Sequence, residues 1–107
     1  MMTFDEILAE LDVLQAADLT HWVEESWVKP LGEGGVLQFA EVDYVRVRFL
    51  CDMYYDLGVG DEALPILLGL VDQVYDLRRH MKKLGTAIEA QPEDVRRAIA
   101  RLLEGGA

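Results

Sequence analysis

The chain has 107 residues, of which 51% are hydrophobic and 28% charged, a composition typical of one folded domain and not of a disordered polypeptide. No apolar run approaches the roughly 20 residues that a membrane-spanning helix needs, and the acidic start MMTFDEILAEL lacks the character of a signal peptide. The single cysteine, Cys51, excludes an internal disulfide, so we expect a cytoplasmic protein.

The net charge of −10 is concentrated in the N-terminal part of the chain. Residues 1–45 contain ten acidic residues and one basic residue, Lys29, a net charge of −9. Residues 46–107 contain ten acidic and nine basic residues, a net charge of −1. This asymmetry indicates a functional acidic face and a basic partner, although a solvated, solubilising surface is the simpler alternative.

Helical spacing begins at Thr3, which forms a capping box with Glu6 and predicts a short first helix. A second helix is expected over residues 16–26, stopped by Lys29-Pro30. Glycines in LGEGG then predict a tight turn between two short extended pieces, residues 27–31 and 36–39. Together these features predict a helix-turn-helix followed by a β-hairpin wing.

A third helix is expected over residues 41–57, ended by Gly58, and a fourth and longest over residues 62–88. The fourth helix has an apolar seam at heptad spacing, formed by Leu67, Leu70, Val74, Leu77, Met81, Leu84 and Ile88. In its first half a second stripe (Leu64, Leu68, Val71 and Tyr75) predicts burial on two sides. A short last helix is expected at residues 95–103. We expect a winged module over residues 1–60 and a helical dimerisation part over 61–107, in one compact domain.

Residues for catalysis or metal binding are few. His21 and His80 lie in different predicted helices without a second ligand at metal spacing. Cys51 lies in an apolar neighbourhood with no histidine placed to activate it. The sequence therefore predicts neither an enzyme nor a metal or cofactor.

The order of elements resembles the MerR-like winged helix-turn-helix superfamily, and within it the chaperone modulators of the CbpM type. The segments that carry the resemblance are VLQFAEVDYVRVRFLCDMYYDLGV and LLGLVDQVYDLRRHMKKL. The likeness covers roughly residues 3–88. It implies a mainly α fold with a small β-hairpin wing and a long, coiled-coil-like C-terminal helix.

The resemblance also implies a function. CbpM-type modulators are dimers that bind the J-domain of a CbpA/DnaJ-like co-chaperone and block its stimulation of the DnaK-type chaperone. The second helix of such a J-domain is basic, because it docks on an acidic groove of the chaperone. MerR activators use the same architecture to bind DNA through arginines in the second helix and the wing. The second helix of this chain has no lysine or arginine.

We therefore expect a non-enzymatic J-domain inhibitor that competes with the chaperone, binds no DNA directly and is nucleoid-associated only through its partner. The expected partner-binding residues are Asp12, Asp18, Glu24, Glu25, Trp27, Glu33, Glu41 and Asp43. The seam of the fourth helix is expected to form a homodimer, although the last helix could instead cover it within one chain. Two alternatives for the function remain open: a MerR-like transcriptional regulator, and an acidic inhibitor of some other basic protein.

Overall fold

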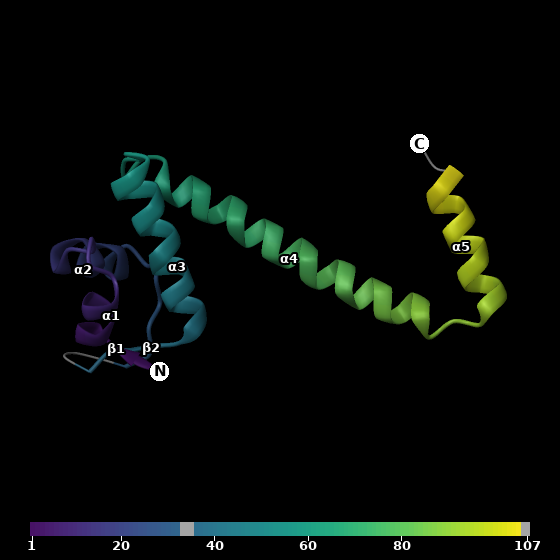
Figure 1. The fold of residues 1–107 in the computed structure, drawn as a ribbon, viewed down its shortest axis with the longest axis horizontal. Coiled ribbons are helices and arrows are strands. Elements are labelled where there is room, and N and C mark those ends of the chain that lie inside the picture. The colour runs from purple at the N-terminus through teal and green to yellow at the C-terminus, as the bar shows by residue number, and fades with distance from the viewer. Residues whose placement is uncertain (33–35, 106–107) are drawn as a thin grey trace. The chain divides into compact units, whose positions relative to one another are not determined.

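The computed structural model describes residues 1–32 and 36–105 (Figure 1). The chain is mainly helical, with a small two-stranded antiparallel sheet and a long helix in its C-terminal part. It divides into two compact units, Met1–Leu68 and Gly69–Ala107. The sequence predicted one compact domain with an internal division at residue 60. That division stays a prediction. The first compact unit extends to Leu68, because the start of the long helix is part of its core.

The elements in chain order are β1 (Met2–Thr3), α1 (Phe4–Glu10), α2 (Ala16–Glu24), β2 (Gln38–Phe39), α3 (Glu41–Cys51), the π-helical turn η1 (Asp52–Asp56), α4 (Leu64–Glu89) and α5 (Glu93–Gly105). The predicted helices are all present with shifted ends. The capping box that starts α1 is also confirmed: the Thr3 hydroxyl accepts from the Glu6 amide at 3.2 Å, and the Glu6 carboxylate accepts from the Thr3 amide at 3.1 Å.

Helix α2 ends in a Schellman motif. The amide of Trp27 donates to the carbonyl of Trp22 at 2.9 Å, and the amide of Ser26 donates to the carbonyl of Val23 at 3.0 Å. Ser26 has a φ of +62°, the left-handed conformation that this motif requires. The predicted helix therefore stops at Glu24, and the chain reverses well before Pro30.

The predicted hairpin is only partly correct. Leu31 and Gln38 form an isolated antiparallel bridge with backbone hydrogen bonds of 2.9 and 2.7 Å. Trp27 and Val28 are not extended, because they form the turn that ends α2. Strand β2 pairs instead with β1, so Phe39 lies opposite Met2, which the sequence did not indicate. The predicted tip, at residues 33–35, lies outside the described residues.

The third predicted helix changes character before its end. Regular α-helix stops at Cys51, and η1 widens the last turn until Gly58, at a φ of +67°, ends it as predicted. This turn presents Tyr54 and Tyr55 to α2, where both rings contact Trp22 at centroid distances of 6.2 and 6.4 Å.

The core lies in the first unit. Its largest fully buried side chains come from α1, α2, the turn after α2, β2, α3 and the start of α4, and are Ile7, Leu19, Trp22, Val28, Phe39, Val47, Leu50 and Leu64. Leu64 and Leu68 of α4 are buried here, as the second stripe predicted. Further along α4 the second stripe becomes exposed to solvent, and Tyr75 is 52% exposed.

Candidate partner-binding surface

The end of α2 carries two exposed acids of the predicted surface. Glu24 is the last residue of the helix, Glu25 is its C-cap, and both are exposed. The C-terminus of a helix has a partial negative charge, so carboxylates there reduce the stability of the helix. Helix α2 contains no lysine or arginine that would offset them.

Trp27 lies directly after these acids and is held in place. Its indole is half-buried and meets the His21 ring edge-on, at a centroid distance of 5.6 Å. Its carbonyl accepts a 2.7 Å hydrogen bond from Nε of Arg46, on α3. His21 in turn has its Nε2 2.9 Å from Oδ2 of Asp61. A fixed, half-exposed tryptophan beside two carboxylates can act as an apolar anchor for a cationic partner.

Two of the predicted partner-binding acids instead stabilise the fold. Asp43 is only 8% exposed, and its carboxylate accepts from the amide of Ala40 at 2.9 Å, which caps α3. Asp18 accepts a hydrogen bond from the hydroxyl of Tyr55. That hydroxyl also accepts from the amide of Gln15 at 3.0 Å. We therefore leave Asp43 out of the candidate surface and assign Asp18 a structural role, which the sequence pattern did not distinguish.

The remaining predicted acids are spread over several elements. Asp12 is exposed in the loop between α1 and α2, and Glu41 is exposed in the first turn of α3. Glu33 lies outside the described residues. The candidate surface is therefore best defined by Glu24, Glu25 and Trp27, which are close neighbours in the chain.

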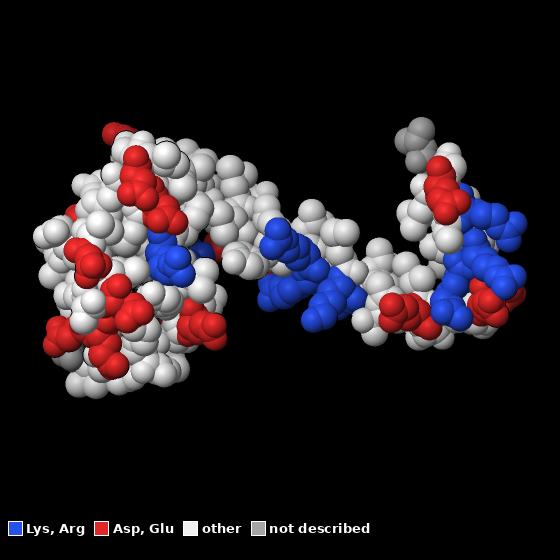
Figure 2. Space-filling model, viewed as in Figure 1, with Lys and Arg blue, Asp and Glu red and all other residues white. Residues whose placement is uncertain are grey.

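The charge asymmetry of the sequence is visible in space. Figure 2 shows acidic side chains across the visible face of the N-terminal unit, with a small basic area among them, and lysine and arginine gathered on the second half of α4 and on α5. In this second unit Arg79 pairs with Asp76, and Arg97 pairs with Glu93 at 2.6 Å. These basic residues belong to helices other than α2.

The apolar seam of α4 is exposed through most of its length. Leu70, Val74, Leu77, Met81 and Leu84 are between 50% and 64% exposed. Leu67 and Ile88, at its two ends, are half-buried. On α5, Leu102 and Leu103 are 74% and 73% exposed, so this helix does not cover the seam within one chain. An uninterrupted exposed apolar stripe of this length is unusual for a surface that stays in water.

Features required for chemistry are sparse in the described part of the chain. Burial, together with the nearby charges of Asp52, Asp56 and Asp18, raises the pKa of the Cys51 thiol from 9.0 to about 11, which makes it a poor nucleophile. Among the described residues no group of three His, Cys, Asp or Glu side chains could hold a metal ion. Nor is any helix there long and apolar enough to cross a membrane.

Comparison of the chain with protein-family models, with curated proteins and with solved structures finds no match. The family suggested by the sequence pattern therefore stays an expectation.

Proposed function

We propose that this protein is a non-enzymatic inhibitor that binds the J-domain of a CbpA/DnaJ-like co-chaperone and competes with the DnaK-type chaperone for it. The finer description of the fold, a MerR-like winged helix-turn-helix, is part of the same proposal. It is supported by the succession of α1, α2 and the Leu31–Gln38 bridge, which lies where the base of a wing would be.

The observation that carries the proposal is the position of Glu24 and Glu25. Each carboxylate at the end of α2 costs stability, about 0.3–1 kcal/mol for an exposed charge at the unfavourable helix end. A cationic ligand, in contrast, would be attracted by them. Two carboxylates that destabilise their own helix lie beside a tryptophan that is held in place. This combination supports binding to a basic protein helix.

Recognition of DNA is the alternative that the same fold would allow. DNA presents one negative charge per about 1.7 Å of helix axis, and its binders neutralise phosphates with lysine or arginine. The reading helix of such a protein would be α2, whose exposed end is acidic and which carries no lysine or arginine. Repulsion would replace the counterion release that drives DNA binding, so we favour the protein partner.

In the proposed mechanism, the acids and the apolar anchor have separate tasks. The carboxylates attract and orient the basic second helix of the J-domain, which accelerates association and sets the register. Trp27 supplies buried apolar area, which slows dissociation. Because the chaperone needs the same basic helix, occupation by this protein blocks it without any chemical step.

We further propose that the protein is a homodimer formed through α4. The exposed seam repeats at spacings of three and four residues, which is the pattern of a coiled-coil interface. Burying such a stripe against a second copy would remove its leucine, valine and methionine side chains from water, at about 25 cal/mol per Å² of apolar surface.

Calorimetric titration of the purified chain with an isolated J-domain tests the proposed function. We expect a complex whose affinity falls as salt is raised, because exposed charges contribute to it. A short DNA duplex at low salt is the comparison ligand, for which we expect no binding. Tight binding of the duplex together with none of the J-domain would instead favour the transcriptional regulator.

A further inference from the structure

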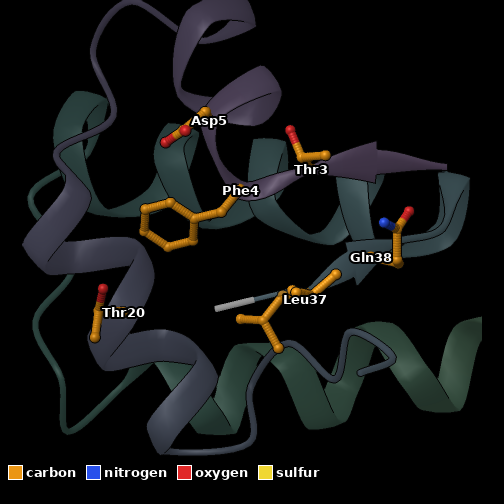
Figure 3. Close-up of a pocket in the computed structure, with 7 residues that line it drawn as sticks. Thr3, Phe4, Asp5, Thr20, Leu37 and Gln38 are labelled. Atoms are coloured by element: carbon orange, nitrogen blue, oxygen red, sulfur yellow. The ribbon is translucent and has the colours of Figure 1, made fainter. Parts of the chain in front are cut away.

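A pocket of about 390 Å³ opens in the N-terminal unit between the first turn of α1, the middle of α2 and the segment that leads into β2 (Figure 3). Figure 3 shows the Phe4 ring extending from the start of α1 toward α2, and Leu37 on the segment before β2. The volume lies in the range of about 300–1,000 Å³ that is common for ligand pockets. Of the predicted partner-binding residues that the structure describes, none lines this pocket.

The floor of this pocket is apolar. Phe4 and Leu37 are half-buried against the core, and Val36 beside them is 67% exposed. Both half-buried side chains already pack on buried neighbours, so the floor is held in place by the fold. Apolar surface in a preformed hollow favours an apolar occupant, because its burial there removes both surfaces from water.

The polar lining of the pocket contains one carboxylate, that of Asp5, besides the neutral side chains of Thr3, Thr20 and Gln38. Asp5, which is exposed, lies in the first turn of α1 and lines the pocket directly. Thr20 lines it from α2, and Glu24 follows Thr20 by four residues on the same helix face, about 5–6 Å away between Cβ atoms. The pocket therefore shares a face of α2 with one of the acids of the partner-binding surface.

We propose that this pocket takes an apolar side chain that projects from the basic helix of the J-domain, while lysines or arginines beside that side chain meet Asp5 and Glu24. This inference rests on the proposed function and extends it, because it adds a specific socket to the electrostatic contact. Charge complementarity selects this occupant. An anionic ligand would be repelled by the Asp5 carboxylate. The N-terminal part of a second copy would also be repelled, because residues 1–45 carry a net charge of −9 in each copy.

Filling the pocket from its rim tests the inference with little risk to the fold. Thr20 is exposed, so Thr20→Phe places a ring in the pocket without disturbing a buried side chain. The matched control is Thr86→Phe, the same change at an exposed helical threonine of the second unit. Each variant is titrated with the J-domain by calorimetry, and far-ultraviolet circular dichroism checks that it is folded.

We expect Thr20→Phe to weaken binding about 10- to 100-fold, the loss for one excluded apolar side chain, and Thr86→Phe to leave it unchanged. The loss should persist at 0.5 M NaCl, whereas the loss caused by Glu24→Gln should shrink, because salt screens charges and not apolar contacts. Unchanged affinity of Thr20→Phe, with the wild type binding normally, would overturn the pocket inference alone. No binding by the wild type would overturn the proposed function itself.

Discussion

The hydroxyl of Tyr55 donates a hydrogen bond to the Asp18 carboxylate, which joins the π-helical turn after α3 to the first turn of α2. The same hydroxyl accepts from the amide of Gln15, the N-cap of α2, which has no side-chain cap of its own. Tyr55 thereby bridges the N-cap amide and the carboxylate of Asp18 at N3, two groups that bond directly in a capping box. The widened turn that positions Tyr55 also fixes the helix that presents Glu24 and Glu25.

Removal of this hydroxyl should destabilise the N-terminal unit. Tyr55→Phe leaves the Gln15 amide and the Asp18 carboxylate without a protein partner, so we expect a loss of about 1–2 kcal/mol. Urea unfolding followed by circular dichroism measures it. Tyr54→Phe is the matched control, because it keeps the ring contacts with Trp22 and Tyr55. Equal loss in both variants would show that the bridge contributes nothing specific.

Stability should fall at alkaline pH. Burial raises the pKa of Cys51 from 9.0 to about 11, and burial with the Asp18 hydrogen bond raises that of Tyr55 from 10.0 to about 12. A pKa raised by folding adds stability that is complete below the unfolded value and is lost as pH rises through the folded one. We therefore expect the free energy of unfolding to be level below pH 9 and to decline toward pH 12. Cys51→Ala should remove the part of this slope that begins near pH 9.

Ser26 offers a stabilising substitution. Its φ of +62° is costly for a residue with a Cβ, and glycine adopts it freely. We expect Ser26→Gly to raise the free energy of unfolding by about 0.5–1 kcal/mol, after allowance for the greater freedom of glycine in the unfolded chain. Thermal unfolding measures the change. A decrease in the free energy of unfolding would mean that the serine side chain makes a contact whose stabilisation exceeds the cost of the left-handed backbone.

Glu24→Gln should raise stability and lower binding. The neutral side chain removes repulsion at the end of α2, worth about 0.3–1 kcal/mol, but also removes attraction for a basic partner. Glu10→Gln is a close control, since Glu10 is likewise exposed at the end of a helix, α1, but lies outside the candidate surface. We expect both variants to gain stability and only Glu24→Gln to lose affinity for the J-domain, about three- to tenfold. If neither variant loses affinity for the J-domain, Glu24 takes no part in binding.

Disruption of the α4 seam should dissociate the proposed dimer. Leu77 lies in the middle of the exposed seam, so Leu77→Glu would place a charge in the interface. Thr86→Glu, on the opposite face of the same helix, is the control. Sedimentation equilibrium should give a dimer for the wild type and for Thr86→Glu, and a monomer for Leu77→Glu. A monomeric wild type at micromolar concentration would contradict the dimer.

Much of the helical framework could be predicted from local signals. The capping box at Thr3 and Glu6, the stop at Gly58 and the burial of Leu64 and Leu68 all follow from spacing and residue type. The second helix was predicted two residues too long, because a left-handed serine at position 26 carries no sequence signal as strong as glycine does.

Features that depend on distant residues could not be predicted. The pairing of Met2 with Phe39 joins the extended piece predicted at residues 36–39 to the start of the chain, which has no strand pattern and lies far from it in sequence. The sequence does not distinguish Asp18 and Asp43, which form hydrogen bonds within the fold, from Glu24 and Glu25. The hydrogen-bond partner of an acidic residue is known only from the folded structure. The pocket beside Phe4 and Leu37 likewise appears only when three elements meet.

The most direct test of the account is a nuclear magnetic resonance titration of the isotope-labelled full chain with an unlabelled J-domain. We expect the largest amide shifts at Glu24, Glu25 and Trp27, with further shifts at Phe4 and Leu37 around the pocket. Shifts confined to α5 and the basic half of α4, or no shifts at all, would contradict the claim that the acidic end of α2 binds a basic protein helix.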